Sequence, residues 1–191
     1  MPEFEQSDVE ELLAKMAKER SALLTAAESL SDTDADRVPQ DADGEEQWTA
    51  KEQLAHLWEM EHAYIAWVRA AVAEDGVAVD GVRGEPVAIP IEDAPGHSVT
   101  ALTAELRAER DRTVSYIRSL SLPDFQRDAS TEVFGELSVM QWLRSFYRHD
   151  RQHTAQIEGR RSDYEPNFQS GREPNQRRMR IEQVARRGQE S

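Results

Sequence analysis

The sequence predicts an all-α protein: a four-helix bundle with long crossover connections and a C-terminal extension. Four segments carry apolar residues at steps of three and four, which is the period of a helix with one buried face. Capping-box signatures open three of these segments, and two of the connections are long and contain Pro and Gly. We therefore assign residues 1–159 to the bundle and residues 160–191 to a basic extension that includes a candidate fifth helix at 175–187.

The first helix is expected over residues 7–30. Ser7, with Glu10 three residues later, has the spacing of a capping box. The apolar residues of this segment recur at helical steps: Val9, Leu12, Leu13, Met16, Leu23, Leu24, Ala27 and Leu30. Residues 31–47 are acidic and contain Pro and Gly, so they are expected to form a loop.

The second helix is expected over residues 49–73. Thr49 and Glu52 form a capping box, and Trp48 lies just before it, where an apolar side chain can pack on the first turn. The buried stripe of this helix comprises Leu54, Leu57, Trp58, Ile65, Val68 and Val72. Residues 74–97 contain seven Gly or Pro residues, which predicts a long irregular connection, and such connections are often functional.

The third helix is expected over residues 98–120, starting at Ser98. Its apolar face carries Leu102, Leu106, Val114, Ile117 and Leu120. Residues 121–137 form the next connector, because Pro and Gly interrupt the helical pattern there. Within this connector, residues 131–137 are expected to be a short extended piece.

The fourth helix is expected over residues 138–159. Ser138 and Gln141 form its capping box, and Gly159 suits the position just after a helix. One face of this helix is formed by residues at steps of four, three, four and four: Trp142, Phe146, His149, His153 and Ile157.

Composition excludes several classes of function. The chain has 191 residues, a net charge of −14 and no cysteine, so thiol nucleophiles, disulfides and cysteine-ligated metals are excluded. No apolar run reaches the roughly 20 residues that span a bilayer, and the acidic N-terminus does not resemble a signal peptide, so we expect a cytoplasmic protein without a membrane partner. Residues 1–159 carry 15 basic and 32 acidic side chains, so nucleic acid is not an expected partner.

His149 and His153 form the most informative motif in the sequence. Residues four apart lie on the same face of a helix, one turn from each other, so two imidazoles can bind one metal ion. Both histidines lie on the apolar stripe, where an unpaired imidazole would carry a desolvation cost. His56, at the edge of the stripe of the second helix, is a candidate third ligand. Three imidazoles favour Zn, Ni, Cu or Fe, and a site with three protein ligands leaves a position open for water or substrate.

Other interpretations of these residues remain open. A buried histidine can instead be paired with a carboxylate, and Asp150 is a candidate partner. A fourth ligand from Glu59 or Asp150 would close the site and make it structural. His62 and His97 are expected at the surface or in a loop. Glu59 and His62 form a Glu-x-x-His motif, but a di-iron site needs a second copy on another helix, which is absent.

Two segments together resemble the DinB-like superfamily of four-helix bundles. The first runs from Trp48 to His56 as Trp-Thr-Ala-Lys-Glu-Gln-Leu-Ala-His, and the second runs from His149 as His-Asp-Arg-Gln-His-Thr-Ala-Gln-Ile. The resemblance spans roughly residues 7–159. It implies a divalent metal, most often zinc or nickel, bound by His56, His149 and His153.

The resemblance also implies an activity. Characterised members include thiol S-transferases and a maleylpyruvate isomerase that use low-molecular-weight thiols such as bacillithiol or mycothiol, and homodimers recur among them. We therefore expect a metal-dependent thiol S-transferase or related isomerase, acting on a small-molecule thiol and an electrophile, and we expect it to form a homodimer. The alternative is a non-catalytic, metal-stabilised stress-response or binding protein. The long connection at 74–97 and the basic tail depart from the family pattern, so no catalytic or substrate-binding residue is assigned.

Overall fold

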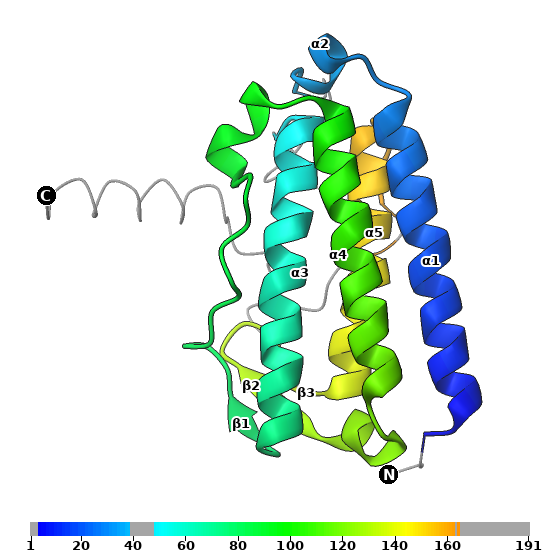
Figure 1. Cartoon of the computed structure of the whole chain (residues 1–191), viewed down its shortest axis with the longest axis vertical. Coiled ribbons are helices and arrows are strands. Elements are labelled where there is room, and N and C mark those ends of the chain that lie inside the picture. Colours follow the sequence, from blue (N-terminus) through cyan, green and yellow to red (C-terminus); the bar gives the residue numbers. More distant parts are fainter. Residues whose placement is uncertain (1–3, 39–47, 163, 165–191) are drawn as a thin grey trace, which may run out of the picture.

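Four long helices form one bundle in the computed structural model of this chain, which describes residues 4–38, 48–162 and 164 (Figure 1). The helices are α1 (Gln6–Glu28), α3 (Ala50–Ala73), α4 (Val99–Ser119) and α5 (Val139–Ile157). The predicted fold class is therefore confirmed, and each helix begins and ends within two residues of its predicted bounds. None of the described helices is both long enough and apolar enough to cross a membrane.

The helices run in an up-down-down-up order. Figure 1 shows α1 and α5 rising towards the same end of the bundle while α3 and α4 descend from it. Because α3 and α4 are parallel neighbours, the chain between them must return along the outside of the bundle. Residues 74–98 make this crossover and include β1 (Val77–Ala78) and the 3-10 helix η2 (Ile91–Gly96), which packs against α3.

The crossover is fastened to α3 by specific contacts. The indole nitrogen of Trp67 donates a hydrogen bond to the carbonyl oxygen of Val82 over 3.1 Å. Nδ1 of His62 lies 2.8 Å from the carbonyl oxygen of Glu85. Between these contacts, Gly84 approaches α3 so closely that an added Cβ would lie 2.6 Å from the carbonyl carbon of His62. Only glycine fits there without displacing backbone.

The start of α1 differs from its prediction. Its N-cap is Glu5, whose backbone N–H donates to the carboxylate of Asp8 over 2.8 Å, so the cap lies two residues before the expected Ser7. The two other predicted capping boxes are confirmed at Thr49 and Ser138. Gly159 follows α5 with a φ of 67°, the left-handed conformation that glycine adopts readily.

The predicted loop over 31–47 contains a short helix, α2 (Asp32–Ala35), where the structure describes it. Asp32 accepts a hydrogen bond from the backbone N–H of Val99, and Asp36 accepts one from Lys51, so polar contacts join α2 to the starts of α4 and α3. The composition of residues 31–47 could not predict these contacts, because both partner residues, Val99 and Lys51, belong to other helices. The candidate helix at 175–187 lies outside the described residues.

The connector between α4 and α5 carries a small sheet. After the 3-10 helix η3 (Leu122–Gln126), β2 (Asp128–Thr131) pairs antiparallel with β3 (Gly135–Ser138), and β1 pairs parallel with β2. The predicted extended piece is therefore a hairpin whose second strand leads directly into α5.

The apolar core is divided into two halves by a polar layer. One half includes Leu23, Leu24, Leu54, Leu57, Leu102 and Leu106. The other half includes Val9, Leu12, Met16, Val68, Ile117, Trp142, Leu143 and Phe146. Between these positions lies a group of buried charged residues, one from each long helix, that contact one another: Arg20, Glu61, Arg110 and Asp150. The predicted histidines lie in and beside this layer.

Candidate metal centre

The three predicted histidines converge. His56 comes from α3, and His149 and His153 come from α5, which packs antiparallel beside it. Nε2 of His149 lies 3.2 Å from Nε2 of His56 and 2.9 Å from Nε2 of His153. One possible ligand atom of each residue lies within 4.8 Å of the other two. Two helices therefore bring to one point the side chains that sequence spacing had marked as candidates.

Local structure explains this convergence. The four-residue spacing places His149 and His153 one turn apart on α5, and their ring centroids are 4.6 Å apart. His56 lies in the second turn of α3, after the capping box that sets where the helix begins. The ring of Trp48, buried just before that helix, packs 4.7 Å from the ring of His56.

A hydrogen-bond chain orients His153. The side-chain nitrogen of Gln53 donates to the carbonyl oxygen of Trp48 over 3.1 Å, which leaves its amide oxygen facing Nδ1 of His153, also at 3.1 Å. A carbonyl oxygen only accepts, so Nδ1 of His153 donates. In the neutral ring Nε2 then carries a lone pair, and this atom lies 2.9 Å from Nε2 of His149.

Burial keeps His149 and His153 uncharged near neutral pH. Burial lowers the pKa of His149 to about 4, with Arg20 adding to the effect and Asp150 opposing it. Burial and the two neighbouring histidines lower the pKa of His153 well below its usual range. Neutral imidazoles are the form that binds metal, so the protonation state suits a ligand set.

The donor set fits a divalent transition metal. Zn–N bonds of about 2.0–2.1 Å would place two tetrahedral ligand nitrogens roughly 3.3 Å apart, close to the Nε2 separations found here. Within the described residues, neither Glu59 nor Asp150, the alternative that would have closed the site, joins the group. Glu59 instead accepts a hydrogen bond from the backbone N–H of Ile91, and Asp150 is engaged by two arginines. Three protein ligands and a remaining position are the arrangement of catalytic zinc sites.

The other two histidines lie apart from this group. His97 is exposed, as predicted. His62 is only partly exposed, and the expectation of a surface histidine is wrong. Its Nδ1 faces the carbonyl oxygen of Glu85, and its Nε2 lies 2.9 Å from the carboxylate of Glu109 on α4. These contacts, above all the one to Glu109, raise the pKa of His62.

Sequence reasoning missed a buried ionic cluster beside the histidines. Arg20 contacts Glu61 at 2.6 Å and Asp150 at 2.9 Å, and Arg110 contacts the same two carboxylates at 2.9 and 3.0 Å. The arginines also donate to backbone carbonyls on neighbouring helices, those of Leu106 and Met16. We call these four residues the ionic cluster. It joins all four long helices and carries no net charge.

Ion pairing affects the pKa values of Glu61 and Arg110 more than burial does, so both stay charged. Burial alone would raise the pKa of Glu61, but Arg110 and Arg20 together lower it to about 2. Likewise, burial opposes the charge of Arg110, but Asp150 and Glu61 raise its pKa. The cluster adjoins His149 across a cavity of about 10 Å³, close to the minimum for one water molecule.

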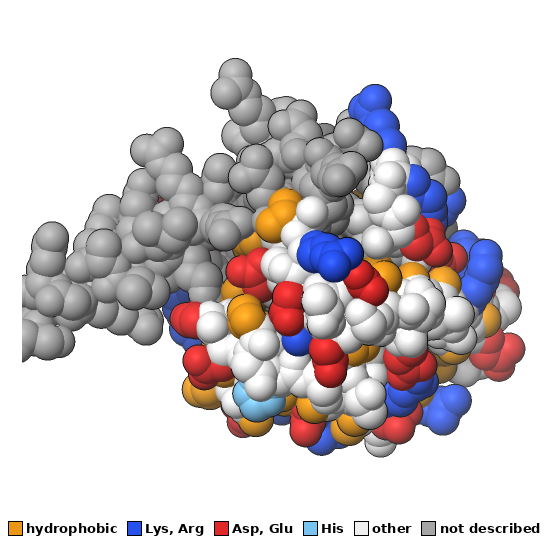
Figure 2. Space-filling view, turned by 90° about the horizontal axis from the view of Figure 1, so that it is seen from above, with side chains coloured by type: hydrophobic (Ala, Val, Ile, Leu, Met, Phe, Trp, Pro, Cys, Tyr) orange, Lys and Arg blue, Asp and Glu red, His pale blue; other side chains and the backbone are white. Residues whose placement is uncertain are grey.

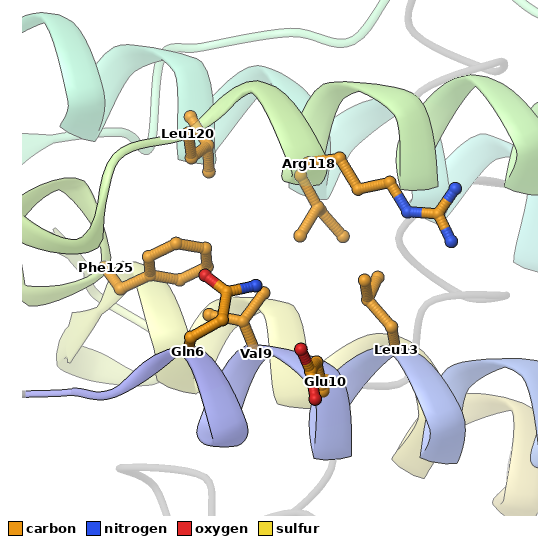
Figure 3. A pocket seen from close by; sticks show the side chains of 8 residues that line it. Gln6, Val9, Glu10, Leu13, Arg118, Leu120 and Phe125 are labelled. Carbon is orange, nitrogen blue, oxygen red and sulfur yellow. The ribbon is translucent and has the colours of Figure 1, made fainter.

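A larger pocket lies far from the histidines, between the start of α1 and the end of α4. Its volume is about 330 Å³, and Figure 3 shows Glu10 and Arg118 on its two sides. Apolar side chains form much of the lining, with Gln6 beside them: Val9, Leu13, Ile117, Leu120 and Phe125. The opposite end of the bundle, seen in Figure 2, shows acidic and basic side chains interspersed.

Comparison with known proteins identifies the family. A family model described as the DinB superfamily matches residues 15–157, so the chain belongs to this superfamily. The uncharacterised protein YuaE of Bacillus subtilis is 25% identical over 125 residues, which cover 59% of this chain and 76% of YuaE.

Two solved structures share the fold. YfiT from Bacillus subtilis, described as a probable metal-dependent hydrolase with an unusual four-helix bundle topology, superposes with a TM-score of 0.64 at 17% identity, covering 83% of this chain and 88% of YfiT. The mycothiol-dependent maleylpyruvate isomerase superposes with a TM-score of 0.60 at 13% identity, covering 78% of this chain and 60% of the isomerase.

Proposed function

We propose that this member of the DinB superfamily is a metal-dependent enzyme that binds zinc or nickel through His56, His149 and His153 and transfers a low-molecular-weight thiol to an electrophile. The observation that carries the proposal is the convergence of three imidazoles, with no carboxylate joining the group among the residues that the structure describes. A structural zinc site has four protein ligands, whereas a site with three can admit a reactant.

The chain's own residues prepare this site. His153 is held by Gln53 with its lone pair towards the other ligands. Asp150, the carboxylate nearest to these histidines in the sequence, forms ion pairs with Arg20 and Arg110. Its negative charge is therefore balanced by the arginines and does not offset the charge of a bound metal. Three uncharged ligands would leave the full double positive charge of a divalent ion at the centre, which favours an anionic fourth ligand.

A thiol is the reactant that suits these features best. A bound divalent metal lowers the pKa of a coordinated thiol or water, so a thiolate would be available near neutral pH. This chain has no cysteine, so the thiol must come from a cosubstrate. The mycothiol dependence of the isomerase that shares the fold supports this choice. YfiT, a probable hydrolase, supports water as the competing reactant.

The test combines metal analysis with an activity screen. Native protein should retain about one equivalent of zinc or nickel, and the metal-loaded protein should accelerate conjugation of bacillithiol or mycothiol with maleimide or chloroaromatic electrophiles. Substitution His56→Ala should abolish both metal retention and conjugation, whereas His97→Ala, an exposed control, should change neither.

Three other outcomes would redirect the proposal. Hydrolysis of esters or amides without thiol dependence would replace thiol transfer by hydrolysis. Tight metal binding without any turnover would favour the non-catalytic, metal-stabilised protein. Failure to bind metal would overturn the proposal as a whole. Homodimer formation stays a prediction, which sedimentation of the metal-loaded protein would check.

A further inference from the structure

We propose that Gln53 is a positioning residue of the metal centre: its amide oxygen fixes the tautomer of His153, and its neutrality preserves the positive charge of the centre for an anionic ligand. This inference rests on the proposed metal binding. Neither the residue spacing nor the family resemblance assigned Gln53 any role.

The geometry leaves Gln53 one arrangement that satisfies both of its polar atoms. Its side chain is fully buried, so neither atom is accessible to bulk water. The carbonyl oxygen of Trp48 can only accept, so it must face the amide nitrogen of Gln53. The amide oxygen is thereby directed at Nδ1 of His153. A reversed amide would set oxygen against oxygen at Trp48, which the close contact forbids.

The same chain of contacts reaches a second ligand. Trp48 supplies the carbonyl that orients Gln53, and its ring packs against the ring of His56. Gln53 also precedes His56 by three residues, so both side chains leave the same side of α3. Two of the three ligands are therefore oriented by one buried unit formed by Trp48 and Gln53.

The chemical identity of this support has a consequence. Ligating histidines often donate their second N–H to a carboxylate, which increases the basicity of the imidazole and the electron density on the metal. Here the acceptor is an uncharged amide. His153 is thus a weaker donor than a carboxylate-supported histidine, and the centre retains more of its attraction for an exogenous anion.

Two substitutions separate this role from simple packing. Gln53→Leu removes both hydrogen bonds of the side chain. Gln53→Glu restores an acceptor for His153 but has no N–H to donate to Trp48. We expect Gln53→Leu to weaken zinc binding about 10–100-fold, the usual effect of losing such a support. We expect Gln53→Glu to bind zinc at least as tightly as the unmodified protein.

Competition with a chelator measures zinc affinity, and absorption of the cobalt-loaded protein reports azide binding as a probe for the anionic ligand. Azide should bind more weakly to Gln53→Glu than to the unmodified protein. Nitrogen-15 spectra of the metal-free protein provide a readout without metal: Nδ1 of His153 should carry the proton in the unmodified protein and in Gln53→Glu but not uniformly in Gln53→Leu. Thr103→Val, which removes a hydrogen bond of a buried side chain within α4, is the matched control and should leave zinc affinity unchanged.

Equal loss of zinc affinity in both Gln53 variants would overturn the inference, because it would show that only the contact with Trp48 matters. Unchanged affinity and tautomer in Gln53→Leu would also overturn it. If the unmodified protein bound no zinc, the proposed function would fail instead, and the tautomer measurement alone would decide the role of Gln53.

Discussion

Two polar clusters lie side by side in the core of this bundle, and they differ in how they limit the desolvation cost of burying polar groups. In the ionic cluster, two arginines and two carboxylates satisfy each other through contacts of 2.6–3.0 Å. In the candidate metal centre, three imidazoles turn nitrogen atoms towards one another, and burial keeps His149 and His153 uncharged near neutral pH. His149 and Asp150 are adjacent in sequence, yet each belongs to a different cluster.

From this difference we predict a structural role for the ionic cluster and a functional role for the three histidines. In a closed set of ion pairs every charged group is already paired, so none is left to bind a ligand. Removing one member leaves its partner as an unpaired buried charge. Neutral imidazoles are less costly to bury than unpaired charges, so we expect the bundle to fold without a metal. We therefore expect the ionic cluster to control stability and the histidines to control metal binding. Three changes test this division, and they are ordered by the size of the expected effect.

The largest loss of stability should follow from Asp150→Asn. This change leaves Arg20 and Arg110 with one carboxylate between them, and breaking a buried pair costs about 3–5 kcal/mol. Urea unfolding of the metal-free protein measures the free energy of unfolding. Arg107→Ala, which breaks the exposed pair with Glu28, is the control and should cost less than about 1 kcal/mol. Similar losses in the two variants would refute a structural role for the cluster.

A smaller loss of stability should accompany a complete loss of metal in His149→Ala. Two ligands would remain, so metal retention should fall below detection, while the free energy of unfolding should decrease by about 1–3 kcal/mol, as for an ordinary destabilising substitution. Metal analysis and urea unfolding of the same sample measure both. If His149→Ala instead unfolded the chain, the histidines would be structural and the division between the clusters would be wrong.

The smallest effect should be a contrast in pH dependence between two histidines. Burial lowers the pKa of His149 to about 4, so its contribution to stability is complete above the unfolded value of about 6.5 and is lost as the pH falls from there towards 4. The pKa of His62 is raised, so its contribution is complete below about 6.5 and is lost as the pH rises through its folded value.

Unfolding free energies of the metal-free protein between pH 4 and 9 measure this contrast. His149→Ala should remove part of the acid-side loss, and His62→Gln should remove part of the alkaline-side loss at a cost of about 0.5–1.5 kcal/mol below pH 6.5. His62→Gln should leave metal binding unchanged, because His62 lies outside the converging group. Loss of metal in His62→Gln would place the centre elsewhere.

The periodicity of the sequence determined the four helices, most of their caps and the pairing of His149 with His153. These are local properties: a capping box spans four residues, and residues four apart share a helical face. The same periodicity held a further signal. Arg20, Glu61, Arg110 and Asp150 each occupy a step of an apolar stripe, where a charged residue is buried and must be paired. Treating the four stripes together would have predicted a polar layer.

Only the tertiary structure decided which partners meet. Glu61 and Asp150 share both arginines, His62 pairs with Glu109, and Gln53 contacts His153 across 100 residues of sequence. Such pairs depend on how packed helices are rotated and shifted along their axes relative to one another. The spacing of residues within one helix gives no information about this. The sequence by itself thus marked which residues could bind a metal, and the packing of α3 against α5 set their nitrogen atoms within reach of one ion.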